Sequence, residues 1–235
     1  MNLKNKTVLI TGGAVRLGKL LVEAFVERGA HVALHYNSSE QKAFELTRKL
    51  GLPGPFQADL SSLSQIDKLV QDVRLRFSTI DILINNAALF FQRNFFETIE
   101  DDYDTLMDVN LKSVFFLSQR VAQNMKEAGC GCIVHIGDAG GDILWANYMA
   151  YCLSKAGVIS LTKAMAKALA PNIRVNCVSS GPLDFAEVDN KNLSNTTLLK
   201  KLGRPQDVVS SVLHVVQSEF MTGSVIYVDG GRAII

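Results

Sequence analysis

Thr11-Gly12-Gly13-Ala14-Val15-Arg16-Leu17-Gly18 follows directly on a short apolar run, Thr7–Ile10, and leads into an amphipathic stretch, Leu17–Arg28. Glycines let the backbone turn tightly and approach a bound group, and free N–H groups at the start of a helix attract anions. Strand, glycine-rich turn and helix in this order are typical of a unit that binds the pyrophosphate of a dinucleotide. A turn that only joins a strand to a helix is the alternative interpretation.

The same alternation of short apolar runs and longer amphipathic stretches continues along the chain. Repeated βαβ units predict one doubly wound, Rossmann-type α/β domain over residues 1–235, with helices on both faces of a parallel sheet. Ligands bind such sheets outside the carboxyl ends of the strands. We expect about seven strands, at Thr7–Ile10, His31–Tyr36, near Phe56, Ile82–Ile84, Ile133–Ile136, Ile173–Val178 and Val225–Val228. We expect six helices, at Leu17–Arg28, Ser39–Leu50, Ser64–Phe77, Asp101–Ala128, Ala150–Ala170 and Gln206–Val216.

One segment, residues 181–202, fits neither pattern because it is polar and rich in asparagine. It follows the sixth predicted strand, at the edge of the sheet where ligands bind. We interpret it as a substrate lid, and an ordinary surface loop is the alternative.

Composition narrows the classes of partner. The chain has 235 residues, 48% of them hydrophobic and 20% charged, and a formal net charge of +1. So small a net charge predicts no nucleic-acid or anionic-membrane partner, and a small molecule fits better. No signal peptide or membrane-spanning run is visible, so we expect a cytoplasmic protein. The four cysteines lack paired metal-ligand spacing, and we expect no metal.

The end of the second predicted strand decides which nicotinamide cofactor is favoured. An acidic residue there would bind the adenosine ribose of NAD and repel the additional phosphate of NADP. The chain instead reads His35-Tyr36-Asn37-Ser38-Ser39, whose hydroxyl, amide and imidazole groups can donate hydrogen bonds to a phosphate. NADPH is therefore expected, and NADH less so. Asp59 is a candidate contact for adenine, or else it caps the helix that starts near Ser61.

Tyr151 and Lys155 lie one helical turn apart in Tyr151-Cys152-Leu153-Ser154-Lys155. A phenol is a poor acid–base catalyst at neutral pH, and an ammonium group beside it favours its ionised form. The pair alone also occurs by chance on many helices.

Further motifs occur in a fixed order, namely Asn85-Asn86-Ala87-Ala88, Val109-Asn110, Pro205 and Val228-Asp229-Gly230-Gly231. With the glycine-rich turn and the Tyr–Lys pair, they resemble the short-chain dehydrogenase/reductase family from Thr7 to Gly231. The resemblance implies hydride transfer with a nicotinamide cofactor, Tyr151 as proton donor, Lys155 on the nicotinamide ribose, Asn110 in the proton relay, and a homotetramer. It implies that the cofactor is bound by Gly12, Arg16, Leu17, Gly18, His35, Tyr36, Asn37, Ser38, Ser39, Asp59, Leu60, Asn86, Ala87, Tyr151, Lys155, Gly181 and Pro182.

Three positions resemble the pteridine reductase and dihydromonapterin reductase branch of that family. Arg16 stands where most members have glycine, Asp138 where most have serine, and Phe90 where the branch has a phenylalanine that stacks on the pterin. Ser38 and Ser180 depart from the expected pattern, and Asp142 is the alternative to Asp138. The substrate residues implied are Arg16, Ala88, Phe90, Asp138, Tyr151 and Leu183, with Asp138, Tyr151, Lys155 and Asn110 as the catalytic set.

The sequence therefore predicts an NADPH-dependent reductase that delivers hydride to a C=N carbon of a pterin-like ring. A carboxyl group beside a ring nitrogen can relay a proton, whereas beside a developing alkoxide it repels charge. The alternative is a carbonyl reductase of the 3-oxoacyl type. A dinucleotide-binding protein without catalysis is a third interpretation, which the intact Asn110, Tyr151 and Lys155 disfavour.

Overall fold

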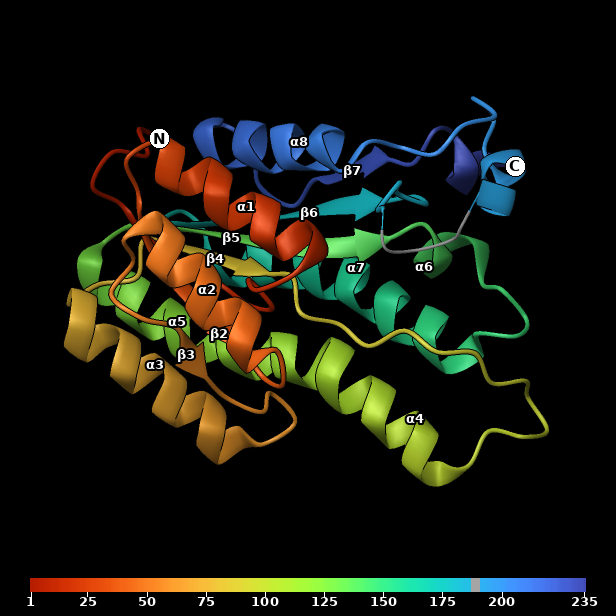
Figure 1. Ribbon diagram of the computed structural model, residues 1–235, viewed down its shortest axis with the longest axis horizontal. Coiled ribbons are helices and arrows are strands. Elements are labelled where there is room, and N and C mark those ends of the chain that lie inside the picture. The colour runs from red at the N-terminus through yellow and green to blue at the C-terminus, as the bar shows by residue number, and fades with distance from the viewer. Residues whose placement is uncertain (187–190) are drawn as a thin grey trace.

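Seven parallel strands form one sheet in the order β3-β2-β1-β4-β5-β6-β7 in a computed structural model that describes residues 1–186 and 191–235 (Figure 1). The predicted α/β fold is confirmed. The strands are β1 (Thr7–Ile10), β2 (His31–Tyr36), β3 (Phe56–Gln57), β4 (Ile82–Asn85), β5 (Gly131–Asp138), β6 (Ile173–Ser180) and β7 (Val225–Val228). The chain switches direction across the sheet between β1 and β4, which places the expected ligand site at their carboxyl ends.

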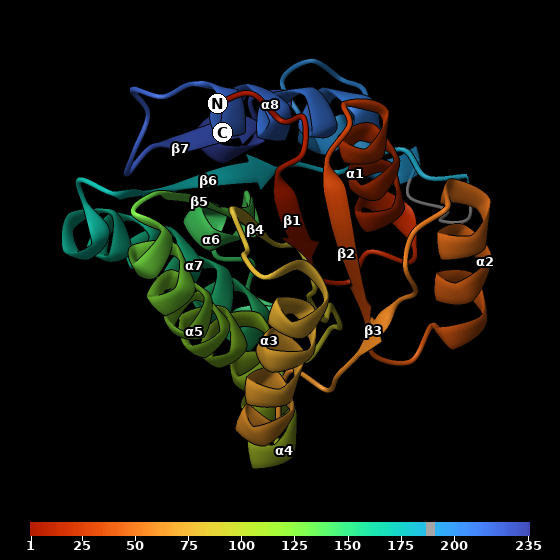
Figure 2. The same cartoon turned by 90° about the vertical axis from the view of Figure 1, so that its left-hand side faces the viewer.

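Helices cover both faces of the sheet, as Figure 2 shows. On one face lie α1 (Arg16–Glu27), α2 (Glu40–Leu50) and α8 (Pro205–Gln217), and on the other α3 (Leu63–Phe77), α5 (Ser113–Ala128) and α7 (Met149–Leu169). Two apolar cores result, because alternate residues of each strand point to opposite faces. Val8 and Ile10 of β1 pack in the first core, and Leu9 between them packs in the second.

The predicted single helix over Asp101–Ala128 is wrong in detail. The structure has α4 (Glu100–Met107), a π-helical turn η1 (Asp108–Lys112) and then α5. A wider turn inside a helix redirects one side chain, and here it buries Asn110. A four-residue helix, α6 (Gly140–Ile143), is too short to leave a periodic pattern.

The structure describes only part of the segment at 181–202, because residues 187–190 lie outside the described residues. A 3₁₀ helix, η2 (Lys191–Thr196), follows them. Leu183 pairs with Gly203 in an isolated parallel bridge, which ties the start of the segment to its end. Its role as a lid stays a prediction.

Among the described residues, no helix is long and apolar enough to cross a membrane.

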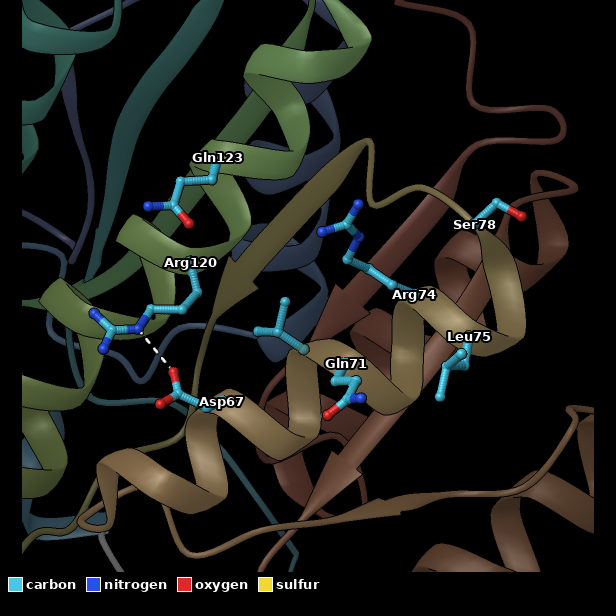
Figure 3. Close-up of a pocket in the computed structure, with 8 residues that line it drawn as sticks. Asp67, Gln71, Arg74, Leu75, Ser78, Arg120 and Gln123 are labelled. Carbon is cyan, nitrogen blue, oxygen red and sulfur yellow. Dashed lines mark hydrogen bonds and ion pairs between the residues drawn. The ribbon is translucent and has the colours of Figure 1, made fainter.

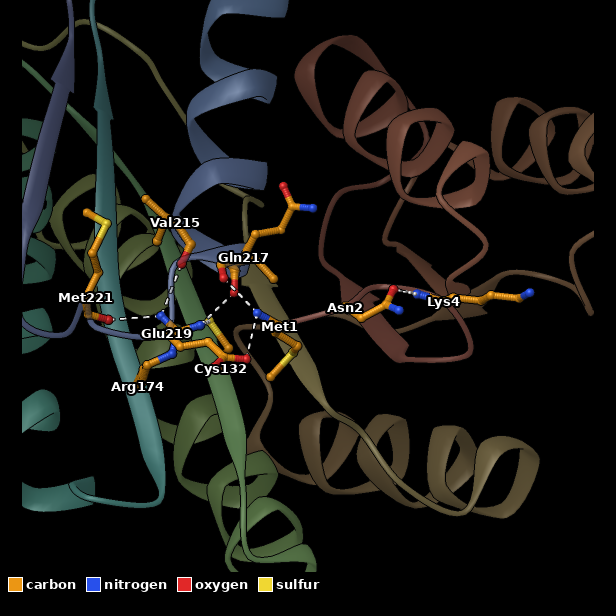
Figure 4. A network of polar contacts seen from close by, with 10 residues as sticks. Met1, Asn2, Lys4, Cys132, Arg174, Val215, Gln217, Glu219 and Met221 are labelled. Carbon is orange, nitrogen blue, oxygen red and sulfur yellow. Dashed lines mark hydrogen bonds and ion pairs between the residues drawn. The ribbon is translucent and has the colours of Figure 1, made fainter.

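Arg174 of β6 fastens the end of α8 to the sheet (Figure 4). Its guanidinium donates to the carbonyl oxygens of Val215 at 3.1 Å and Val216 at 2.7 Å, at the end of the helix, and to Met221 at 2.9 Å. The last carbonyls of a helix have no partner within it, so a buried end needs donors from elsewhere. The fixed planar fork of arginine supplies three at once.

We expect Arg174→Ala to lower the free energy of unfolding by about 3 kcal/mol, because it leaves several half-buried carbonyl groups without a hydrogen-bond donor. Urea denaturation of the parent, Arg174→Ala and Arg174→Lys measures this, and lysine should recover only part of the loss. A loss below about 1 kcal/mol in the alanine variant would show that water replaces the guanidinium.

Candidate active site

A cavity of about 520 Å³ opens at the carboxyl ends of the strands. Residues that follow each of the seven strands contribute to it, so residues far apart in the sequence meet there. All but one of the residues predicted for cofactor, substrate or catalysis line this cavity, and Asn110 is the exception. Those that line it are Gly12, Arg16, Leu17, Gly18, His35, Tyr36, Asn37, Ser38, Ser39, Asp59, Leu60, Asn86, Ala87, Ala88, Phe90, Asp138, Tyr151, Lys155, Gly181, Pro182 and Leu183.

The glycine-rich turn leaves room for a group that side chains would fill. Gly12 has φ +62°, and a Cβ at Gly18 would collide with the Gly12 carbonyl oxygen. The Asn86 amide nitrogen donates to the carbonyl oxygens of Thr11 at 2.8 Å and Gly12 at 3.2 Å, which fixes the turn from β4. The open backbone at the start of α1 fits a dinucleotide pyrophosphate.

Arg16 adopts a backbone conformation that normally favours glycine. Its φ is +47°, in the left-handed region, and its side chain is exposed at the cavity. A residue with a Cβ costs roughly 1 kcal/mol or more there. Glycine would avoid that cost, so the arginine is consistent with a role for its charge beside a bound anion.

His35 does not act as sequence reasoning expected. Its Nδ1 accepts a hydrogen bond from the Gly12 N–H at 3.1 Å, and its Nε2 lies 3.0 Å from the Ala58 carbonyl oxygen, to which it donates. Both ring nitrogens are therefore engaged within the protein, and the imidazole has no donor left for a phosphate. It instead holds the glycine-rich turn against β2. Burial lowers its pKa from 6.5 to about 4, which keeps it neutral.

A second fully buried histidine, His135 of β5, has its pKa lowered to about 3 by burial. For both histidines the folded pKa lies below the unfolded value of 6.5, so the unfolded chain takes up protons first. Their contribution to stability is complete above about pH 6.5 and is lost as the pH falls toward the folded pKa.

We therefore expect acidification from about pH 7.5 to 5 to lower the free energy of unfolding by about 2 kcal/mol for each of these two histidines. Urea denaturation at both pH values tests this, and His135→Gln should remove about half of the difference. Equal stability at the two pH values would contradict the neutral, buried assignment.

The adenosine end of the cavity has no carboxylate at the end of β2. Asn37, Ser38 and Ser39 line it, as the sequence predicted. Asp59 also lines it, and its Oδ1 accepts a hydrogen bond from the Ser61 N–H at 2.9 Å. That bond closes a turn before α3, whose N-cap residue is Ser62, so the predicted capping role of Asp59 is wrong. The carboxylate stays at the wall of the cavity, and its contact with adenine stays a prediction.

Tyr151, Asp138 and Lys155 meet at the other end of the cavity. Asp138 ends β5, Tyr151 and Lys155 lie on α7, and the Tyr151 phenol and the Asp138 carboxyl are close enough for each to shift the pKa of the other. The Asp138 Oδ1 accepts a hydrogen bond from the Gly140 N–H at 2.7 Å. Lys155 is buried and its Nζ donates to the Ile136 carbonyl oxygen at 3.0 Å. Asp142, the alternative to Asp138, instead accepts from the Tyr227 hydroxyl at 3.1 Å.

The pKa of Tyr151 differs from the expectation that Lys155 favours the phenolate. Burial, and then the neighbouring Asp138 carboxylate, raise the pKa of Tyr151 well above its ordinary value. Burial also raises the pKa of Asp138 and lowers that of Lys155. The phenol is thus held in its protonated form, which suits a proton donor.

Asn110 lies beside the site rather than in it. Its side-chain amide donates to the Leu89 carbonyl oxygen at 2.9 Å and to the Ser154 hydroxyl at 3.2 Å, and its oxygen accepts from the Leu89 N–H at 2.8 Å. These bonds give the side chain a positioning role, and the part of Asn110 in a proton relay stays a prediction. The side chain fixes the loop that carries Phe90.

Phe90 stands at the mouth of the cavity. Its ring stacks on Tyr148, with centroids 4.9 Å apart and planes 5° apart, and meets Tyr151 edge-on at 4.8 Å. The side chain is 58% exposed. A flat ligand beside Tyr151 would therefore meet an aromatic surface already assembled from two rings.

Sequence reasoning missed two residues of the substrate end, Trp145 and Arg232. Both line the cavity, and the Arg232 guanidinium lies over the Trp145 ring at 4.4 Å from its centroid. One signal could have found Arg232, because it directly follows the Asp229-Gly230-Gly231 motif. Trp145 lies in a loop without a pattern.

A second hollow, of about 450 Å³, lies between α3 and α5 (Figure 3). Its polar side chains come from these two helices and from Ser78, which follows α3. The Arg120 Nε forms an ion pair with the Asp67 Oδ1 at 2.9 Å. It contains neither a strand end nor a glycine-rich turn, so we place the chemistry at the first cavity. Among the described residues, no cluster of histidine, cysteine and acidic side chains could hold a metal ion.

Comparisons with known proteins agree with this geometry. The family profile described as enoyl-(acyl carrier protein) reductase matches residues 13–233. A 3-oxoacyl-(acyl-carrier-protein) reductase of Thermotoga maritima is 34% identical, with each chain fully covered, and one of Vibrio cholerae is 31% identical, again with each chain fully covered. An NAD-dependent glycerol dehydrogenase of Listeria innocua is 28% identical, covering 99% of this chain and 96% of that protein.

Solved structures show the same fold. A variant of a Serratia marcescens short-chain dehydrogenase/reductase superposes with a TM-score of 0.91 at 28% identity, covering 99% of this chain and all of that one. A blue fluorescent protein from a metagenomic library, solved with NADPH, gives 0.90 at 27% identity and the same coverage. The chain belongs to the short-chain dehydrogenase/reductase family and is an NAD(P)H-dependent oxidoreductase.

Proposed function

We propose that this oxidoreductase uses NADPH to reduce a C=N bond in a pterin-like ring. One observation carries the proposal: the Asp138 carboxyl lines the cavity beside the Tyr151 phenol, at a position where most of the family is expected to have serine. A serine hydroxyl donates to the oxygen of a ketone as negative charge develops on it. A carboxylate repels that charge, whereas a protonated carboxyl group beside a ring nitrogen can pass on a proton.

The residues of the chain divide the work between the two ends of the cavity. The turn from Gly12 to Gly18, with Arg16, would hold the pyrophosphate, and Lys155 would hold the nicotinamide ribose. When bound, NADPH supplies the hydride. Tyr151 keeps its proton because its pKa is raised, and it donates that proton to the substrate nitrogen. Asp138, whose pKa burial raises, then gives its carboxyl proton to the phenolate and takes up another proton from solvent.

A 3-oxoacyl reductase is the second candidate, and the names of the relatives favour it. Three of the relatives named in that way are 30–34% identical to this chain over its whole length or nearly so. The alternative thus has the support of these names. Asp138 counts against a simple ketone because its negative charge would repel the developing alkoxide, and Arg16 counts against it because it resembles the pteridine reductase branch.

By family resemblance we further propose a homotetramer.

NADPH oxidation by the purified protein, with a dihydropterin and with a 3-oxoacyl thioester as substrates, tests the proposal. We expect kcat/KM for the dihydropterin to be at least about tenfold the larger, which is a difference of about 1.4 kcal/mol. A larger value for the thioester would establish the second candidate instead.

We expect NADPH to be preferred over NADH, because no carboxylate faces the 2′-phosphate position. Asn37→Asp introduces one at an exposed position that lines the cavity, and should reverse or abolish the preference. The ratio of kcat/KM for the two cofactors measures this. Asn2→Asp is the control, because Asn2 lies before β1 and does not line the cavity. A parent enzyme that prefers NADH would contradict the assignment.

A further inference from the structure

Arg232 begins a short 3₁₀ helix, η3 (Arg232–Ile234), directly after β7. Its guanidinium lies over the Trp145 ring and lines the cavity. Within the described part of the chain, that guanidinium has no hydrogen bond or ion pair, although arginine carries five N–H donors in a planar fork. A half-buried arginine with unpaired donors at the wall of an active site is equipped to receive a ligand.

The backbone under Arg232 is fixed by Asp229. One carboxylate oxygen of Asp229 accepts from the Gly231 N–H at 2.9 Å, and the other accepts from the Ala233 N–H at 2.7 Å. The Asp229 carboxylate is thus engaged with the backbone and does not pair with the guanidinium within 4.0 Å. The arginine is held in place without its donors being used.

Trp145 places the guanidinium beside the catalytic carboxylate. A Cβ added to Gly140 would lie 2.9 Å from the Trp145 ring and 3.0 Å from the Asp138 Oδ1, so the ring and the carboxylate are about one methyl group apart. Arg232 is close enough to Asp138 to lower the pKa of that carboxyl. Tyr151, Asp138, Trp145 and Arg232 therefore form a continuous wall at one end of the cavity.

The segment after 190 also packs on the turn that carries Arg232. The Leu199 N–H donates to the Gly230 carbonyl oxygen at 3.2 Å, and a Cβ at Gly231 would lie 2.8 Å from the Leu198 side chain. Arg232 thus lies between the segment after residue 190 and Asp138, at the end of β5.

We propose that Arg232 determines substrate choice by donating two parallel N–H groups to a planar substrate edge that carries two acceptors side by side. Such an edge is a carboxylate, or a ring carbonyl next to an unprotonated ring nitrogen. Binding it against Arg232 directs the reducible bond toward Tyr151 and Asp138. The inference deepens the proposed function and uses the same site, but it concerns ligand affinity and can be tested without turnover.

Isothermal titration of the NADP⁺-saturated protein with pterin and with benzoate, compared between the parent and Arg232→Met, tests the inference. We expect at least about tenfold weaker binding of one or both probes, because bidentate contacts to a charged donor are among the strongest hydrogen bonds. Loss for pterin alone identifies the ring edge, and loss for benzoate alone identifies a carboxylate. Equal affinities in parent and variant overturn the inference, whatever substrate the enzyme reduces.

Two further variants separate recognition from support of the fold. Arg76→Met removes an exposed arginine of α3 and should leave the affinities for both probes unchanged. Arg232→Lys keeps the charge but not the planar fork, and should bind the probes within about threefold of the methionine variant. Full recovery by lysine would overturn the two-donor geometry. A matching loss of NADP⁺ affinity in Arg232→Met would also overturn the proposal, because it would show a structural role.

Discussion

Replacing Tyr151 by phenylalanine is expected to lower kcat at least about a hundredfold while leaving the dissociation constant for NADPH nearly unchanged. The hydroxyl is the group that carries the proton, and loss of one general acid costs about two to four orders of magnitude. Burial and Asp138 raise the pKa of Tyr151, so the parent keeps this proton across neutral and mildly alkaline pH. Turnover under saturating substrate and fluorescence titration with NADPH measure the two quantities.

Tyr103→Phe is the matched control, since Tyr103 is an exposed tyrosine of α4. It should retain the turnover of the parent. Unchanged turnover in Tyr151→Phe would remove Tyr151 from the mechanism. An equally large loss of NADPH affinity would show that the hydroxyl serves binding rather than proton transfer.

Much of the site could be predicted because it depends on local patterns. Gly12 and Gly18 bracket a strand–turn–helix unit, and the parallel sheet brings the carboxyl ends of its seven strands to the same edge. Tyr151 and Lys155 share a face through helical spacing alone. Asp138 could be placed beside them only through the family resemblance, and the structure places it in the same cavity, where it raises the pKa of Tyr151.

The features that sequence analysis did not predict depend on contacts between distant segments. His35 is engaged by Gly12 and Ala58, and no local pattern reveals which ring nitrogen is used. Asn110 is turned toward Leu89 by a π-helical turn that helical periodicity does not register. Arg232 meets Trp145 across 87 positions of the chain, through packing alone.

Asp138→Ser is the second change with a large expected effect, and it should act in opposite directions on two substrates. With a dihydropterin we expect kcat/KM to fall at least about tenfold, because a serine hydroxyl cannot easily replace a carboxyl group as a proton relay. With a small reactive diketone we expect equal or higher activity. The substitution removes negative charge beside the developing alkoxide and adds a neutral donor.

Asp142→Ser provides the control, because it makes the same substitution four residues further along. Asp142 contacts Tyr227 and does not line the cavity. Both activities should stay within about twofold of the parent. A fall in both activities of Asp138→Ser would show that Asp138 only positions Tyr151.

The most direct test of the C=N assignment is the ratio of kcat/KM for the dihydropterin to kcat/KM for the diketone, measured in the parent and in Asp138→Ser with NADPH. A ratio between substrates cancels errors in active-enzyme concentration and general losses of stability. We predict that the ratio falls at least about tenfold in the variant, or about 1.4 kcal/mol of transition-state selectivity. A ratio that stays unchanged or rises would contradict a proton relay through Asp138, and with it the assignment of this enzyme to C=N reduction.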